Sequence, residues 1–353
     1  MNKEIEIICE IGKNFCTTKE EQPISVLLEN AKKLIREAKN AGADVAKWQV
    51  HNYLDEIHPE AHITSPHFDQ DRYEWVKRNT YPFSFWLILK AYCEAIGIEF
   101  LATPMSRGAA VLLEELGVKR WKIGSGDICD FVLLDYIRQT GKPVILSSGM
   151  SSLEELRKAY NYLKEKVDDI TIMHCVSIYP CPLEKLNLLT IPFLKKEFPE
   201  AKIGFSDHSQ GVVGSLMAKF LGAEVIEKHF TLNKNAWGSD HNISLEPLDF
   251  KFLCEDLKKK YTLEEKKEME TIIKNTKSLG VETKFINEEE MKFRKVFHKG
   301  LFAGRDIKKG EPIAREDIIA LRPRGDAPKS EEYEFYLDKT ATKDIPKYGI
   351  IEL

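Results

Sequence analysis

The chain has 353 residues, of which 43% are hydrophobic and 31% charged, and 52 Lys and Arg nearly balance 56 Asp and Glu. This composition is typical of a globular protein, and the length predicts about two domains, or one large barrel with an appendage. The near-neutral charge argues against a basic field that would attract nucleic acid or an anionic membrane. Seven dispersed cysteines without a CxxC pair argue against a disulfide framework or zinc ribbon, and no stretch reads as a signal peptide or membrane span. A cytoplasmic protein is therefore expected.

Short apolar runs alternate with stretches of helical period from residue 5 to about 260, which predicts repeated βα units. The expected strands are Ile5–Glu10, Val45–Gln49, Glu99–Thr103, Arg120–Ile123, Pro143–Ser147, Ile170–His174, Lys202–Phe205 and Val225–His229. A first helix, ended by Gly42, is expected from Ile24, and others near 83–96, 107–116, 131–139, 152–164, 188–198, 212–221 and 248–260. Eight strands each followed by a helix predict an α/β fold, the (β/α)8 TIM barrel. A doubly wound open sheet is the alternative, but no GxGxxG motif follows the first strand.

The barrel is expected to occupy residues 1–262, followed by a charged linker at 263–292 and a small β-rich module at 293–353. The module contains a weak internal repeat, in which residues 306–313 resemble residues 344–351. About 60 residues bury little core alone, so the module is expected to lean on the barrel or on a partner subunit. Segment 50–80 is long for a βα loop and is either a functional lid or a plain surface insertion.

Polar residues gather where the expected strands end, which is where (β/α)8 enzymes carry their catalytic groups. Lys47 and Lys122 each lie at a strand end, and Ser125, Ser147 and Ser206 offer neutral donors beside them. Two ammonium groups among neutral donors suit a phosphate or a carboxylate. The sequence therefore favours an anion site over a surface role for both lysines.

Histidines and carboxylates at other strand ends predict a metal site and a proton-transfer group. His208 and His229 end neighbouring strands, so their neutral imidazoles could ligate one divalent ion, and a structural role is the alternative. Glu10 lies in an apolar strand and is interpreted as a proton-transfer group, a metal-site carboxylate acting through water, or a structural partner of Lys47. Asp240 follows the last strand, close to the expected metal. The remaining histidines considered are His174, expected in the core, and His51, His58, His62 and His67, expected to be solvated loop residues.

Taken together, these residues resemble the sialic acid (N-acetylneuraminate) synthase family, and the resemblance covers essentially the whole chain. Its motifs, specific in combination, are CEIG (9–12), AKNAGADVAKWQ (38–49), ATPMSR (102–107), KIGSGD (122–127), ILSSGMSSLEEL (145–156), HCVSIYP (174–180), GFSDHSQG (204–211), EKHFT (227–231), GSDHNISLEP (238–247) and the stretch 293–324. The resemblance implies a TIM barrel joined to an antifreeze-like (SAF, β-clip) domain. It also implies a domain-swapped homodimer, in which this domain covers the partner's active site.

The activity that the resemblance implies is condensation of phosphoenolpyruvate (PEP) with an N-acetylmannosamine-type aldose, giving a sialic-acid-like 2-keto acid and phosphate. The resemblance assigns PEP binding to Lys47, Thr103, Lys122, Ser125, Ser147 and Ser206, and Mn²⁺ or Mg²⁺ to His208 and His229. It assigns sugar binding to Gln49, Asp127, Tyr179 and Asp240, and to Arg322 reaching the acyl group from the neighbouring subunit. The implied catalytic residues are Glu10, Asp240 and Lys122.

Departures from the family pattern leave the acceptor sugar open. Residues 13–18 replace the usual Asn-His and Gly, Ser177 replaces an Asn, and Asp127 stands where others have Glu. The acceptor could be N-acetylmannosamine, a di-N-acetylated sugar leading to legionaminate or pseudaminate, or another relative. A 3-deoxy-ulosonate synthase that uses a pentose phosphate would need a second basic cluster, for which Arg107 and Arg322 are the obvious contributors. A non-catalytic sugar-binding protein would be expected to have lost the lysines and histidines, which are present.

Overall fold

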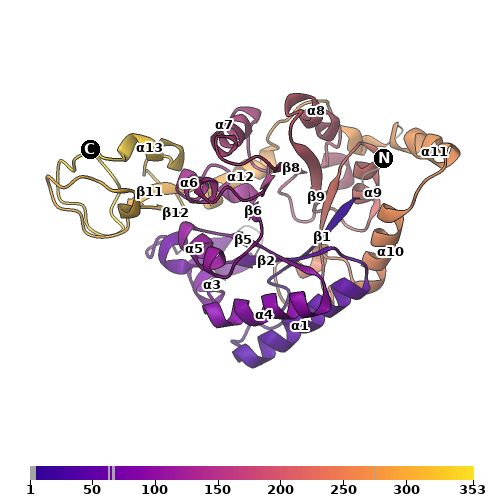
Figure 1. Cartoon of the computed structure of the whole chain (residues 1–353), viewed down its shortest axis with the longest axis horizontal. Coiled ribbons are helices and arrows are strands. Elements are labelled where there is room, and N and C mark those ends of the chain that lie inside the picture. The colour runs from indigo at the N-terminus through magenta and orange to yellow at the C-terminus, as the bar shows by residue number, and fades with distance from the viewer. Residues whose placement is uncertain (1–4, 63, 66–67, 275) are drawn as a thin grey trace.

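The computed structural model describes residues 5–62, 64–65, 68–274 and 276–353, and its centre is a ring of eight parallel strands (Figure 1). These strands are β1 (Glu6–Gly12), β2 (Val45–Val50), β5 (Glu99–Pro104), β6 (Trp121–Ile123), β7 (Val144–Ser147), β8 (Ile170–Cys175), β9 (Lys202–Asp207) and β10 (Val225–His229). They are hydrogen-bonded in the order β5-β2-β1-β10-β9-β8-β7-β6, and β6 lies beside β5 to close the ring. The predicted (β/α)8 barrel is confirmed, and every expected strand is present within one or two residues of its predicted ends.

Helices surround the ring and pack their apolar faces on it (Figure 1). Those that follow the strands are α1 (Ile24–Asn40), α4 (Phe83–Ile96), α5 (Arg107–Glu115), α6 (Phe131–Gln139), α7 (Leu153–Lys164), α8 (Thr190–Glu197), α9 (Val213–Phe220) and α10 (Pro247–Lys258). In α1, buried residues recur every three or four positions, so one face of the helix is apolar. Local signals fix the ends: a capping box of Ser152 and Glu155 begins α7, and Gly97, with φ 72°, ends α4.

Apolar side chains fill the barrel below the carboxyl ends of its strands. We call this group the apolar plug, and the site lies directly on top of it, at the carboxyl end of the ring. The plug consists of Ile8, Val45, Leu101, Ile145, Met173 and Val225, one from each of six strands. Successive side chains in a strand point to opposite faces, so the residue two positions further along each strand also points inward. Those residues are Glu10, Lys47, Thr103, Ser147, Cys175 and Glu227. Strand alternation alone therefore places polar groups at the carboxyl end of the ring.

Segment 50–80 folds over the mouth of the barrel. It contains α2 (Tyr53–Glu56), a hairpin of β3 (Thr64–Ser65) and β4 (Phe68–Asp71), and α3 (Arg72–Arg78). Ile57, Ala61 and Val76 form a small apolar cluster that ties α2 to α3. His67 lies outside the described residues. Because this segment supplies side chains to the pocket described below, the lid interpretation holds over the plain insertion.

The C-terminal part of the chain returns to the barrel mouth through two helices and then forms a small β module on one side of the molecule (Figure 1). Its elements are α11 (Leu263–Lys274), α12 (Glu288–Phe297), β11 (Gly300–Ala303), β12 (Ile318–Leu321) and α13 (Tyr333–Tyr336). The expected boundary at residue 293 thus falls inside α12. In the described parts of the chain, no helix is both long and apolar enough to cross a membrane.

The internal repeat of the module has a structural counterpart. Ile307 and Ile345, at equivalent positions of the two copies, exchange two backbone hydrogen bonds of 2.8 Å each. Asp344 accepts a bond from the backbone N–H of Lys309, and Asp306 accepts one from Lys347 in the same way. The two copies therefore pair about a local pseudo-twofold axis, with each aspartate capping the turn of the other copy.

Candidate active site

One pocket opens at the carboxyl end of the strands and brings together every residue to which the family resemblance assigns a site role. These are Glu10, Lys47, Gln49, Thr103, Lys122, Ser125, Asp127, Ser147, Tyr179, Ser206, His208, His229, Asp240 and Arg322. They come from all eight strand ends and from the C-terminal module. Their common location is a structural finding, whereas their individual roles remain predictions.

Two lysines and two carboxylates alternate at the bottom of the pocket. Glu227 of β10 lies between the lysines, 2.6 Å from Lys122 Nζ and 3.5 Å from Lys47 Nζ. Lys47 Nζ also lies 2.6 Å from Glu10 Oε2, and these four side chains are all nearly inaccessible to solvent. The group, which we call the inner tetrad, is therefore electrically balanced when all four members are ionised.

The tetrad's environment sets its protonation states. Burial alone would raise the pKa of Glu227, but Lys122 and Lys47 lower it to about 2. Lys47 has two carboxylate neighbours, which raise its pKa despite burial, whereas burial lowers the pKa of Lys122, which has one close carboxylate and the repulsion of Lys47. At neutral pH, Glu227 is therefore a carboxylate held between two cations.

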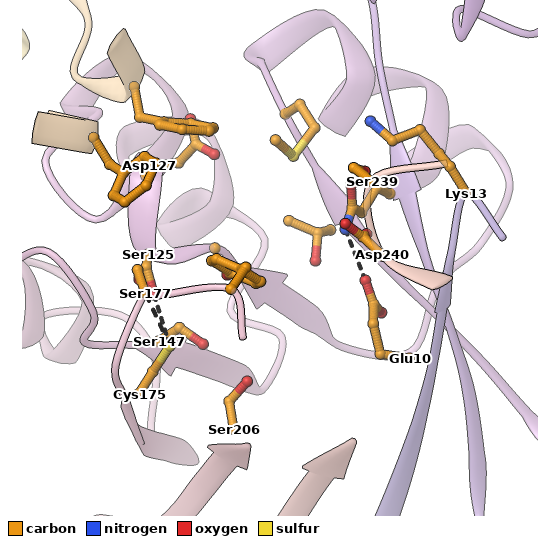
Figure 2. A pocket seen from close by; sticks show the side chains of 18 of the residues that line it. Glu10, Lys13, Ser125, Asp127, Ser147, Cys175, Ser177, Ser206, Ser239 and Asp240 are labelled. Atoms are coloured by element: carbon orange, nitrogen blue, oxygen red, sulfur yellow. Dashed lines mark hydrogen bonds between the residues drawn. The ribbon is translucent and has the colours of Figure 1, made fainter. Parts of the chain in front are cut away.

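Small hydroxyl side chains form the wall beside the lysines. Figure 2 shows Ser125, Ser147 and Ser206 on this wall together with Ser177 and Cys175. Ser125 Oγ accepts a 3.1 Å bond from the backbone N–H of Gly149, and Ser206 Oγ donates to Glu227 at 3.2 Å. These hydroxyls are small, neutral donors around two ammonium groups, which is the donor set that a phosphate or carboxylate needs.

On the side of the pocket opposite the serine wall, Glu10 and Asp240 face each other (Figure 2). Glu10 Oε1 accepts a 2.8 Å hydrogen bond from Gln49 Nε2, while its Oε2 pairs with Lys47. Gly12 lies between these groups with φ 54°, and a Cβ there would come within 3.1 Å of Glu10 Oε1 and 3.5 Å of Asp240 Oδ2. The CEIG motif therefore needs its glycine both for backbone conformation and for space.

His208 and His229 face the same pocket and are the candidates for holding a divalent metal ion. Their ring centroids are 5.4 Å apart, and burial lowers the pKa of both imidazoles, which keeps them neutral. His208 Nδ1 donates to the backbone carbonyl of Val176 at 3.0 Å, which leaves the Nε2 lone pair free to ligate. His229 Nδ1 is buried without a hydrogen-bond partner, 3.9 Å from Asp240 Oδ2. An orphaned nitrogen, a second imidazole and a carboxylate form a donor set typical of open metal sites.

A buried hydrogen-bonded chain runs from the lid to the pocket wall. Lys13 Nζ lies 2.7 Å from His51 Nε2, and His51 Nδ1 lies 2.7 Å from Glu56 Oε2. Burial lowers the pKa of His51 to about 4, so the neutral ring accepts from Lys13 and donates to Glu56. The expectation that His51 is a solvated loop residue is therefore wrong: the lid buries it to 2% exposure.

Arg322 enters the pocket from the module of the same chain. Its Nη2 lies 2.5 Å from Asp127 Oδ1. Its backbone is hydrogen-bonded to the lid, because the N–H of Arg322 donates to the carbonyl of Glu56 and the N–H of His58 donates to the carbonyl of Arg322. The resemblance implies that this arginine comes from the neighbouring subunit; the single chain described here places its own Arg322 in the pocket, and the exchange of modules between subunits stays a prediction.

Several pocket residues were missed in the sequence. Glu227 carries the same signal as Glu10, a carboxylate inside an apolar strand, and could have been found by it. Lys13 lies in the departing segment 13–18 but was given no role. Arg72 follows a hairpin whose position over the pocket depends on tertiary packing, so no sequence signal identified it. Arg107 was named as a basic contributor, but its guanidinium donates to backbone carbonyls of the module and does not line the pocket.

Two other groups have the chemistry of ligands but lie outside this pocket. His174 Nε2 bonds to the carbonyl of Leu186 at 2.7 Å and its ring stacks on Phe205, which confirms its expected place in the core. Cys129, Glu155 and Glu331 bring ligand atoms within 4.8 Å of one another. Both oxygens of Glu155, however, are already bound by Arg294, at 2.8 and 2.6 Å.

Comparison with known proteins shows the family to which the chain belongs. A model of the NeuB family matches residues 34–269. N,N'-diacetyllegionaminic acid synthase of Campylobacter jejuni is 35% identical over 92% of this chain and 94% of its own length. Human N-acetylneuraminate-9-phosphate synthase is 37% identical over 68% of this chain and 66% of its own. The solved structure of spore coat polysaccharide biosynthesis protein SpsE from Bacillus subtilis matches with a TM-score of 0.77 and 30% identity, over 99% of this chain and 95% of that one. The chain therefore belongs to the NeuB family.

Proposed function

We propose that this chain is a nonulosonic acid synthase, which condenses PEP with an N-acetylmannosamine-type aldose and releases phosphate. The observation that carries the proposal is one pocket in which two buried lysines meet two neutral histidines. In the balanced reaction, C3 of PEP forms a bond with the aldehyde carbon of the sugar, and water adds to C2. The bond between C2 and the phosphate oxygen then breaks, which leaves a 2-keto acid and inorganic phosphate.

PEP would lie over the inner tetrad, with its phosphate and carboxylate among Lys47, Thr103, Lys122 and the serine wall. Glu10 and Glu227 already balance the two lysines, so a bound anion needs positive charge beyond them. A Mn²⁺ or Mg²⁺ ion held by His208 and His229 would supply that charge and act as a Lewis acid on the sugar aldehyde. The donor set supports an ion there and leaves its identity open.

Proton transfer would fall to Glu10 and Asp240, with Lys122 beside the phosphate that leaves. The aldehyde oxygen gains a proton as the new bond forms, and the attacking water loses one. Burial alone would raise the pKa of Asp240, but His229 and nearby donors lower it, so this carboxylate is ionised and can accept a proton. Glu10 is held in place by Gln49 and Lys47 and faces the same space.

The acceptor would lie toward the lid, against Gln49, Asp127, Tyr179, Asp240 and Arg322. Sialic acid formation from N-acetylmannosamine is one candidate reaction. A di-N-acetylated trideoxy sugar is a second, favoured by the nearly full-length match to a N,N'-diacetyllegionaminic acid synthase. The enzyme needs no nucleic acid or membrane for this chemistry, and its seven free cysteines support a reducing, cytoplasmic compartment. A homodimer that exchanges its modules would present Arg322 to the partner's pocket, and this arrangement remains a prediction of the resemblance.

The proposal predicts that phosphate release requires three components together. Purified protein should release phosphate from PEP only when Mn²⁺ and an N-acetylated aldose are both present. Omitting the sugar tests for simple PEP hydrolysis, and adding EDTA tests for the metal. Equal phosphate release with and without sugar would contradict the proposal.

A further inference from the structure

Two buried guanidinium groups share one aromatic ring at the outer end of the pocket. The guanidinium carbon of Arg72, from the lid, lies 4.3 Å from the ring centroid of Phe297, and that of Arg322, from the module, lies 5.7 Å from it. Arg72 is 7% exposed and Arg322 is fully buried, and both line the pocket. Burial of two like charges side by side is costly unless an anion lies between or beside them.

The hydrogen-bonding capacity of these arginines is largely unused. Nε of Arg72 and both Nε and Nη1 of Arg322 are buried without a hydrogen-bond partner. Among the described residues, Nη2 of Arg322 does have acceptors, Asp127 Oδ1 at 2.5 Å and the carbonyl of Met105 at 3.5 Å. Buried N–H groups are almost always satisfied in folded proteins, so three such donors at one pocket wall point to a missing acceptor.

Each neighbouring carboxylate is engaged elsewhere through one oxygen, while Glu56 Oε1 and Asp127 Oδ2 have no hydrogen-bond partner among the described residues. Asp127 also pairs with Lys299 at 2.9 Å, and Glu56 accepts from His51. Glu56 Oε1 is 4.0 Å from Arg322 Nε, which is too far for a hydrogen bond. Within the part of the chain that the structure describes, no carboxylate lies within ion-pair distance of Arg72.

The cations at this end also repel one another. Burial and then Arg322 lower the pKa of Arg72 to about 10. Burial lowers the pKa of Lys13 to about 8, and Arg72 contributes to that shift, against the opposing charges of Asp240 and Glu56. An anion bound here would relieve this repulsion, whereas at the inner tetrad each lysine already has a carboxylate.

We propose that Arg72 and Arg322 form a clamp for an acidic group, a carboxylate or a phosphate, on the acceptor sugar. Planar guanidinium groups match both anions with paired N–H donors, and their stacking on Phe297 fixes their orientation. The clamp lies on the lid and the module, apart from the strand-end lysines that suit PEP. Arg72 is thus a specificity-determining residue for the acceptor, and this inference rests on the proposed function.

The test compares three acceptors with PEP and Mn²⁺: N-acetylmannosamine, its 6-phosphate and the corresponding uronate. Consumption of PEP and the mass of the 2-keto acid are followed. We expect kcat/KM for one acidic acceptor to exceed that for the neutral sugar by at least about tenfold, since one charge-assisted contact supplies that much. A preference for the 6-phosphate identifies a phosphate, and a preference for the uronate identifies a carboxylate.

Variants of Arg72 show whether this residue binds the acidic group of the acceptor or only stabilises the structure. Arg72→Gln should lower kcat/KM for the acidic acceptor by about 10- to 100-fold more than it lowers kcat/KM for the neutral sugar. Arg72→Lys keeps the charge and should recover part of the preference. The matched control is Arg78→Gln on the same helix, because Arg78 bonds to backbone carbonyls of Thr18 and Glu20 outside the pocket and should leave the preference intact.

The outcomes distinguish the clamp from the proposed function. If the neutral sugar is used as well as or better than both acidic ones, the clamp is overturned while the synthase activity stands. An equal loss of kcat/KM for all acceptors in Arg72→Gln would also overturn the clamp, because a purely structural role would affect every acceptor alike. If none of the three sugars yields a 2-keto acid and a di-N-acetylated neutral sugar does, the clamp is again overturned. If no acceptor yields one, the proposed function itself fails.

Discussion

The inner and outer ends of the pocket differ in how their buried cations are neutralised. At the inner tetrad, Lys47 and Lys122 come from strands and each lies within 2.6 Å of a carboxylate. At the outer end, Lys13, Arg72 and Arg322 come from a loop, helix α3 of the lid and the module, and they are held by an imidazole, an aromatic ring and one aspartate. The comparison supports the proposed division of labour, in which the barrel would carry the chemistry common to the reaction and the appended segments would carry the recognition of the acceptor.

The largest expected effect is at the inner tetrad. Lys122→Met removes a cation from the expected phosphate site and leaves Glu227 with Lys47 at 3.5 Å. We expect kcat/KM to fall by about 10³-fold, as when a positioned charge-stabilising donor is removed, and the free energy of unfolding to fall by about 3–5 kcal/mol. Steady-state kinetics and urea unfolding measure both.

The control for this variant is Lys142→Met, which removes a partly exposed lysine paired with Glu114 at 2.6 Å. A surface pair contributes about 0–1 kcal/mol, so both stability and activity should change little. If Lys122→Met behaved like this control, the inner tetrad would not be the centre of the reaction.

A second large effect concerns the metal between the two ends. His229→Ala removes one of the two expected ligands, so the affinity for Mn²⁺ should fall by more than the 10- to 100-fold typical of outer-sphere changes. Metal content after gel filtration measures this loss directly. His62→Ala, an exposed histidine paired with Asp71, is the control and should retain wild-type metal content. Retention of stoichiometric Mn²⁺ by His229→Ala would contradict the ligand assignment.

The third effect is a pH dependence of stability at the outer end. The pKa of Lys13 is about 8 in the folded protein and has an ordinary value of 10.5. The unfolded chain therefore binds this proton more tightly, and stability should rise as pH increases from about 8 to 10.5. Lys13→Met should stabilise the protein by about 2 kcal/mol at pH 7, a value reduced to allow for the partial exposure of Lys13, and by less at pH 10. Urea unfolding from pH 7 to 10 measures the difference, and an identical pH slope in both proteins would contradict it.

The smallest expected effect tests which chain completes the outer end. A homodimer that exchanges its modules, as the resemblance implies, would pair Lys122 of one subunit with Arg322 of the other, so mixing Arg322→Ala with Lys122→Ala subunits should restore activity toward about one quarter of the wild-type value. The mixture should be unfolded and refolded together, with wild-type protein carried through the same steps as a control. No recovery would instead indicate that each chain completes its own pocket.

The sequence predicted the inner part of the site well because strand geometry is local. A two-residue alternation places Glu10 and Lys47 above the apolar plug, and this pattern can be read directly from the chain. His51 was misjudged because its burial depends on the lid, which closes over it through contacts with distant segments. Arg72 gave no signal for the same reason: its partner ring, Phe297, is more than 200 residues away in the sequence.

The most direct test of the central claim is to run the reaction in ¹⁸O-labelled water and to weigh both products. Because water adds to C2 of PEP, the account predicts unlabelled inorganic phosphate. It also predicts a 2-keto acid whose mass, apart from the label, equals PEP plus sugar plus water minus phosphoric acid. Pyruvate together with ¹⁸O-labelled phosphate would show that the pocket merely hydrolyses PEP, and would contradict the synthase assignment.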